Sequence, residues 1–150
     1  MDVHTPAQRS HNMSRIRSQD TKPELQVRRG LHAAGFRFRL HVADLPGRPD
    51  LVFPRYRAVV LVNGCFWHGH NCQLFSMPST RQEFWETKIA KNQERDRRNT
   101  QALEATRWRV LTIWECALKG VGRRPFRDIL GSCEAFLRGD AISTEIIGFR

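Results

Sequence analysis

Two thiols and two imidazoles lie within a single short loop of this chain. Residues 65–72 read Cys-Phe-Trp-His-Gly-His-Asn-Cys, and thiolates and imidazoles at such spacing are typical of a tetrahedral zinc site. A third thiol, Cys116, directly follows a predicted strand, and either His68 or His70 would supply the fourth ligand. Four protein ligands leave no open position, so the predicted zinc is structural and not catalytic. The alternative is a set of reduced thiols packed in the core.

A carboxylate and an imidazole form a second group of residues that could take part in catalysis. Asp50 stands where a short strand leaves a Pro-Gly-Arg-Pro turn, a position from which a carboxylate can hold Mg²⁺ at a sheet edge. The next predicted strand ends at Val62, close to His68. If the two strands pair, metal-activated water and a proton-transferring imidazole would meet, as phosphodiester hydrolysis requires. The alternative is that Asp50 is an ordinary turn residue.

Composition narrows the class of partner. The chain has 150 residues, which suits one domain, and 25 Lys and Arg against 15 Asp and Glu give a net charge of +10. Such an excess favours a polyanionic partner, and nucleic acid is favoured over a membrane surface. We find no apolar run that could span a bilayer and no signal peptide, so we expect a cytoplasmic, nucleoid-associated protein. Cys133 shares an apolar helical stripe and is predicted to be a core thiol.

Capping motifs and hydrophobic periodicity predict the elements that position these groups. Thr21 to Glu24 form a capping box that begins a helix ending at Gly35, and Ser79 or Thr80 with Glu83 begins a second helix that runs to about Ala105. A third helix is predicted over 125–138, and strands over 36–42, 50–53, 58–62 and 108–114. In the first of these strands Leu40 is expected to face inward and His41 outward, and the strand over 58–62 is expected to be buried on both faces. Residues 1–18 are predicted to be an N-terminal arm or helix and 19–150 a single domain. The fold class is α/β, a mixed β-sheet flanked by helices.

The second helix and the loop suggest a DNA-binding surface. Four basic residues spaced three, four and three apart line one face of the helix: Lys88, Lys91, Arg95 and Arg98. This stripe is interpreted as facing phosphates, with a solvated charged face as the alternative. Aromatic side chains beside it, Phe66, Trp67 and Trp85, are predicted to insert between stacked bases, with core packing as the alternative. Insertion costs less at a weak base pair, which favours mismatched DNA.

The motifs together resemble one family. They are residues 45–50 (Leu-Pro-Gly-Arg-Pro-Asp), 63–68 (Asn-Gly-Cys-Phe-Trp-His), 81–85, 92–98, 108–111 and 114–118 (Trp-Glu-Cys-Ala-Leu). This combination closely resembles the very short patch repair, or Vsr, endonucleases from about Asn12 to Gly120. The resemblance implies a restriction-endonuclease-like core and a magnesium-dependent nick 5′ of the thymine in a T:G mismatch. Such mismatches arise when 5-methylcytosine deaminates beside a cytosine methylase site.

The resemblance also implies a role for particular residues. Asp50 and His68 would be catalytic with Glu24 in support, and the Val62 carbonyl would join Asp50 on magnesium. The structural zinc ligands would be Cys65, His70, Cys72 and Cys116. The intercalating side chains would be Phe66, Trp67, Trp85 and, from the N-terminal segment, Met13. The DNA backbone would be contacted by Asn63, Lys88, Lys91, Asn92, Arg95 and Arg98. A MutL-type partner and a monomeric state are expected from the family.

One departure from the family pattern lies at the end of the predicted central strand. Val62-Asn63 stand where we expect Thr-His. A backbone carbonyl survives the first change, whereas Asn63 loses any proton-transfer role and keeps hydrogen bonding. Two alternatives remain: a restriction or homing-type nuclease that cuts matched duplex DNA, and a zinc-stabilised DNA-binding module without catalysis.

Overall fold

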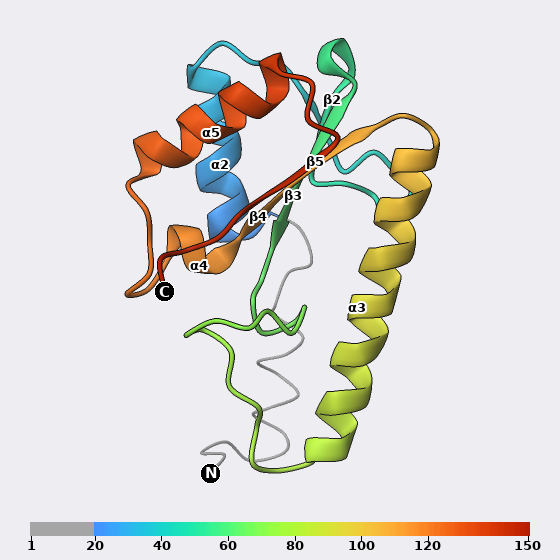
Figure 1. The fold of residues 1–150 in the computed structure, drawn as a ribbon, viewed down its shortest axis with the longest axis vertical. Helices are drawn as coiled ribbons and strands as arrows, with labels where there is room; N and C mark the ends of the chain where they lie inside the picture. The colour runs from blue at the N-terminus through green and yellow to red at the C-terminus, as the bar shows by residue number, and fades with distance from the viewer. Residues whose placement is uncertain (1–19) are drawn as a thin grey trace.

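The computed structural model describes residues 20–150, and these form a five-stranded mixed sheet with helices on both faces (Figure 1). This confirms the predicted mixed α/β architecture. The predicted N-terminal arm and Met13 lie outside the described residues.

The sheet follows the order of the sequence. Its strands are β1 (Arg39–Leu40), β2 (Leu51–Phe53), β3 (Ala58–Asn63), β4 (Arg109–Trp114) and β5 (Ser143–Ile146). The first three are antiparallel neighbours, whereas β3, β4 and β5 run parallel. Asn63 pairs with Trp114 in the register of β3 and β4. The segments that leave these two strands therefore begin at the same edge of the sheet.

Helices cover the two faces of the sheet unequally. On one face, α2 (Lys22–Ala33) and α5 (Phe126–Arg138) lie side by side (Figure 1), and the core there includes Leu31, Val60 and Ile129. On the other face, Val59 and Val110 pack with Leu103 near the end of α3 (Gln82–Ala105). β3 thus buries side chains on both faces, as its continuous apolar run at 58–62 predicts.

The long helix α3 projects beyond the sheet. Only Ile89 and Leu103 are buried among its residues, and its first half runs alongside the loop that follows β3 (Figure 1). Because so little of α3 is needed for the core, its exposed basic side chains are available to a ligand.

The two predicted capping boxes have different outcomes. Thr21 caps α2 by accepting a hydrogen bond from the Glu24 N–H at 3.4 Å, as predicted. The cap predicted for α3 is wrong: the helix begins only at Gln82, after Arg81 in a left-handed conformation (φ 54°) and without a side-chain cap. Ser79 and Thr80 therefore lie too early in the chain to reach the first free N–H groups.

Two strand predictions need correction. The strand predicted over 36–42 is reduced to Arg39–Leu40, and Leu40 is 42% exposed instead of buried. The pairing stops because His41 turns into the left-handed region (φ 48°). The sequence of the tail gave no prediction, yet Ser143–Ile146 forms β5; Ile146 is the only large apolar residue of the four, so the sequence shows no apolar alternation there.

Two smaller findings concern the core and the membrane. Cys133 is fully buried as predicted, and burial raises the pKa of its thiol to about 12. Within residues 20–150, no helix combines the length and apolar character needed to cross a bilayer.

Candidate active site and metal centre

Asp50 is fixed to the end of β3. It immediately precedes β2, and its Oδ2 accepts a hydrogen bond from the Val62 N–H at 2.8 Å. The antiparallel pairing of β2 with β3, on which the sequence argument depended, is therefore present. Burial raises the pKa of Asp50 to about 7; the hydrogen bond from Val62 acts to lower it, and the neighbouring Glu24 carboxylate raises it further.

Glu24 brings a second carboxylate to Asp50 from α2. It is 1% exposed, and Arg28 Nη1 lies 3.2 Å from its Oε2. Arg28 also contacts Asp20 at 2.7 Å, and His41 Nε2 lies 3.1 Å from Glu24 Oε2. Sequence reasoning missed these three neighbours. The i, i+4 spacing of Glu24 and Arg28 was a usable signal, whereas His41 was assigned to the polar face of a strand.

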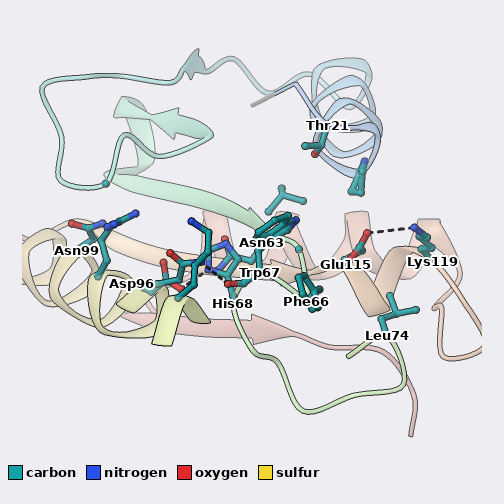
Figure 2. Close-up of a pocket in the computed structure, with 17 residues that line it drawn as sticks. Thr21, Asn63, Phe66, Trp67, His68, Leu74, Asp96, Asn99, Glu115 and Lys119 are labelled. Atoms are coloured by element: carbon teal, nitrogen blue, oxygen red, sulfur yellow. Dashed lines mark hydrogen bonds and ion pairs between the residues drawn. The ribbon is translucent and has the colours of Figure 1, made fainter. Parts of the chain in front are cut away.

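The His68 imidazole is oriented by a helix distant in sequence. Its Nδ1 lies 2.5 Å from Oδ2 of Asp96 on α3. Because an ionised carboxylate only accepts, the proton of this hydrogen bond is on Nδ1, and Nε2 is left for chemistry. Asp96 was missed as a functional residue, although it lies within the 92–98 motif. Figure 2 shows the two side chains facing each other.

A cavity of about 880 Å³ joins these elements. Its wall comes from the start of α2, the end of β3, the following loop, α3 and α4 (Glu115–Leu118). Val62, Asn63 and His68 line it. Asp50 is connected to this wall through its hydrogen bond to Val62. The carboxylate pair and the imidazole are thus brought to the same end of β3.

Three thiols and one imidazole converge beside this cavity. The ligating atoms of Cys65, His70, Cys72 and Cys116 all lie within 4.8 Å of one another, and both Cys65 Sγ and Cys116 Sγ lie 3.6 Å from His70 Nδ1. A tetrahedral ion with bonds of about 2.3 Å to sulfur and about 2.0–2.1 Å to nitrogen gives a sulfur–nitrogen separation of about 3.6 Å, so the site fits such an ion. The sequence left His68 or His70 open as the fourth ligand, and the structure places His70 in this cluster.

The surroundings of the cluster favour metal-bound thiolates. The N–H groups of Cys116 and Gly148 donate to the sulfurs of Cys65 and Cys116 at 3.3 and 3.4 Å. Burial raises the pKa of the Cys65 thiol, with further contributions from the neighbouring thiols, so a bound cation is what would hold it as thiolate. The Trp114 ring stacks on His70 at 4.1 Å and fixes the imidazole plane.

The three predicted intercalating aromatics that the structure describes form one cluster. The ring centroids of Phe66, Trp67 and Trp85 lie 5.2 to 5.8 Å apart, and Phe75 stacks on Phe66. All four are only partly buried, and Phe66 and Trp67 line the cavity (Figure 2). The cluster is therefore neither a closed core nor a set of isolated surface rings.

The basic stripe on α3 borders more than one hollow. Lys88 and Arg95 line the cavity, whereas Lys91 and Arg98 line a shallower groove that Arg95 shares. Asn92 has a structural contact of its own, because its side-chain amide donates to the Trp67 carbonyl at 2.8 Å. This contact uses a donor that the sequence assigned to the DNA backbone.

Glu115 is a further residue that sequence reasoning missed. Its Oε1 accepts from the Cys65 N–H at 3.2 Å, and its carboxylate also lies beside Lys119. It directly precedes Cys116, so it ties the start of the metal loop to the end of β4.

The comparisons with known proteins all indicate the same family. The profile of the family described as DNA mismatch endonuclease Vsr matches residues 1–74. The chain is 46% identical to the DNA mismatch endonuclease Vsr of Escherichia coli K12, over 97% of this chain and 93% of that protein. It is 48% identical to a type II nicking enzyme of Xanthomonas oryzae, over 79% of this chain and 87% of the relative.

A type II nicking enzyme of Neisseria meningitidis serogroup A is 43% identical over 79% of the chain and 84% of its own length. Identities of 43 to 48% over 79 to 97% of this chain, together with the site geometry above, place the protein in one family. The chain belongs to the Vsr family of DNA mismatch endonucleases and is a strand-nicking nuclease.

Proposed function

We propose that this protein is a magnesium-dependent DNA endonuclease that nicks one strand 5′ of the thymine in a T:G mismatch, on a restriction-endonuclease-like core. The observation that carries the proposal is the shared cavity. Its wall combines the end of β3 to which Asp50 is hydrogen-bonded, the oriented His68, basic side chains of α3 and partly exposed aromatics. A nuclease that acts on a distorted duplex needs all four.

The chemistry would be divided among a few groups. Asp50 and the Val62 carbonyl would hold Mg²⁺, which neutralises a phosphate oxygen and activates water. His68 would move a proton through Nε2 while Asp96 holds the ring at Nδ1. Glu24 would support Asp50 from the protein side. Asn63 would offer a hydrogen bond to a phosphate.

The substrate would be gripped by α3 and opened by the aromatic cluster. Lys88, Lys91, Arg95 and Arg98 would neutralise phosphates, while Phe66, Trp67 and Trp85 would enter the base stack, with Met13 meeting them from the other groove. Unstacking costs about a few kcal/mol per step and least at a mismatch.

Zinc is the ion we propose for the cluster of Cys65, His70, Cys72 and Cys116. Three thiolates and one imidazole suit Zn²⁺ better than the oxygen-preferring Mg²⁺. A fully occupied tetrahedral site would hold the loop that carries Phe66, Trp67 and His68.

Several finer points follow from the family. We propose a functional link to a DNA cytosine methylase, a MutL-type repair partner, a monomeric state and a cytoplasmic, nucleoid-associated location. A second candidate function is cleavage of matched duplex DNA. The observation in its favour is that two relatives are named type II nicking enzymes, without mention of a mismatch.

The test is a strand-specific nicking assay. Duplexes that carry one T:G mismatch in different cytosine-methylase contexts are compared with matched T:A duplexes, each with Mg²⁺ or with a chelator of Mg²⁺. A Mg²⁺-dependent nick 5′ of the mismatched thymine supports the proposal. Cutting of matched duplex alone would support the second candidate, and binding without cutting would indicate a DNA-binding module.

Asp96→Asn is expected to slow nicking by about 10²-fold or more, because the amide lacks the charge of the carboxylate and can turn its NH₂ group toward Nδ1, which would hold the His68 ring in the wrong tautomer. The rate is measured in single turnover at saturating DNA and Mg²⁺, and DNA affinity should stay within about threefold. Glu104→Gln, a change at a carboxylate on α3 outside the cavity, is the control. A rate equal to that of the wild type would remove Asp96 from the site.

Arg95→Ala is expected to weaken DNA binding and to reduce the slope of log K against log salt concentration by about 1. Arg95 lines the cavity and also the shallower groove on α3. Arg97→Ala is the matched control, because Arg97 is paired with Glu94 at 2.5 Å and lines neither. Affinity is measured by fluorescence anisotropy at several salt concentrations. Equal slopes for the two variants would refute a phosphate contact at Arg95.

A further inference from the structure

His41 occupies a strained position beside the carboxylate pair. Its backbone φ is 48°, a left-handed conformation that residues other than glycine seldom adopt. Its side chain is only 11% exposed. Strain at a buried polar residue persists only where the surrounding contacts impose it, and it gathers at functional sites.

The contacts of His41 run to three carboxylates. Nε2 lies 3.1 Å from Glu24 Oε2 and 3.4 Å from Asp20 Oδ1. Nδ1 lies 4.0 Å from Asp50 Oδ1, and the His41 N–H donates to the Asp50 carbonyl at 3.2 Å. The ring therefore contacts Glu24 and lies near Asp50, while its backbone N–H holds the segment that bears Asp50.

We infer that His41 is a positioning residue that sets the separation and orientation of Glu24 and Asp50 for a divalent cation. The inference rests on the proposed magnesium site at Asp50. Two neighbouring carboxylates repel each other when both are ionised, and a ring that donates to Glu24 while its backbone N–H holds the Asp50 carbonyl would keep the two in place. Partners of this kind typically alter metal affinity or activity about 10–100-fold when removed.

A direct metal-binding role for His41 fits the contacts less well. Asp20, Glu24 and His41 place their ligating atoms within 4.8 Å of one another. However, Arg28 Nη1 already lies 2.7 Å from Asp20 and 3.2 Å from Glu24. A metal ion at that point would sit against a guanidinium. The fixed cation of this group is Arg28, and His41 acts on the carboxylates as a hydrogen-bond donor.

The experiment compares His41→Ala, His41→Gln and His41→Asn in the zinc-loaded full chain. The Gln amide can replace the donor at Nε2, which serves Glu24, and Asn tolerates the left-handed backbone. Binding of Mn²⁺ alone, as a probe for Mg²⁺, is measured by water-proton relaxation without DNA. Nicking is measured in single turnover against Mg²⁺ concentration. His32→Ala, an exposed histidine on α2, is the control, and circular dichroism checks folding.

His41→Ala should raise the half-saturating Mg²⁺ concentration and the Mn²⁺ Kd by about 10–100-fold, with a smaller change in the rate at saturating Mg²⁺. His41→Gln should recover most of the loss. Wild-type values in all three variants would overturn the inference. Two Mn²⁺ ions in the wild type and one in His41→Ala would also overturn it, in favour of direct ligation. A wild type that does not nick would refute the proposed function, and the Mn²⁺ titration would then decide the role of His41 separately.

Discussion

Asp50→Asn is expected to abolish Mg²⁺-dependent nicking while leaving DNA binding intact. The Val62 N–H donates to the Asp50 carboxylate at 2.8 Å. The substitution keeps the size of the side chain and an acceptor for this hydrogen bond, but it removes the charge that would hold Mg²⁺. Metal stabilisation of the transition state is worth several kcal/mol, so the single-turnover rate should fall on the order of 10³-fold or more.

Asp44→Asn serves as the matched control, because Asp44 is an exposed carboxylate in the segment leading to the same turn. It should nick at the wild-type rate. If Asp50→Asn kept more than about a tenth of wild-type activity at saturating Mg²⁺, Asp50 would not be the metal-binding carboxylate.

The same substitution has an expected effect on stability. Burial raises the pKa of Asp50 from 3.8 to about 7, so between these values the folded chain binds more protons than the unfolded chain. The contribution of Asp50 to the free energy of unfolding therefore falls as pH rises from about 4 to about 7. Asp50→Asn should remove this fall, and the variant should gain stability relative to the wild type at pH 8 more than at pH 5. The free energy of unfolding of both proteins, Mg²⁺-free and zinc-loaded, is measured with denaturant at the two pH values. Parallel pH profiles of the two proteins would contradict the prediction.

Cys72→Ser is expected to release the structural zinc and to lower both thermal stability and nicking. Zinc binding to structural sites is worth about 10–16 kcal/mol in peptides, comparable with the whole stability of a domain, about 5–15 kcal/mol. Even a loss of about 3 kcal/mol would lower Tm by about 6–12 °C. Nicking should fall as well, because His68 lies in the loop that the ion would fix.

Cys133→Ala is the matched control, since Cys133 is a buried thiol in the α5 core and outside the metal cluster. It should keep one zinc per chain by elemental analysis and lose only the packing of one sulfur. Equal zinc content in Cys72→Ser and Cys133→Ala would remove Cys72 from the ligand set.

Local sequence patterns predicted several features of the fold and of the site correctly. Three local patterns gave a correct element or environment because each depends on neighbours in sequence: the apolar run at 58–62, the capping box at Thr21 and the apolar stripe that holds Cys133. The thiol and imidazole spacing likewise predicted a metal cluster, since three of its four members share one loop.

Other features depend on the folded chain. Only the parallel register of β3 and β4 brings Cys116 to the loop after β3, and only the packing of α3 brings Asp96 to His68. The positive φ of His41 ends β1 early and turns an expected surface residue toward Glu24. β5 forms because the parallel edge of β4 accepts it, although its own residues show little alternation. Sequence patterns decided which groups were present and which helices and strands carried them, because propensity and periodicity act within an element. Tertiary packing decided which of those groups meet, because contacts between distant segments have no local signature.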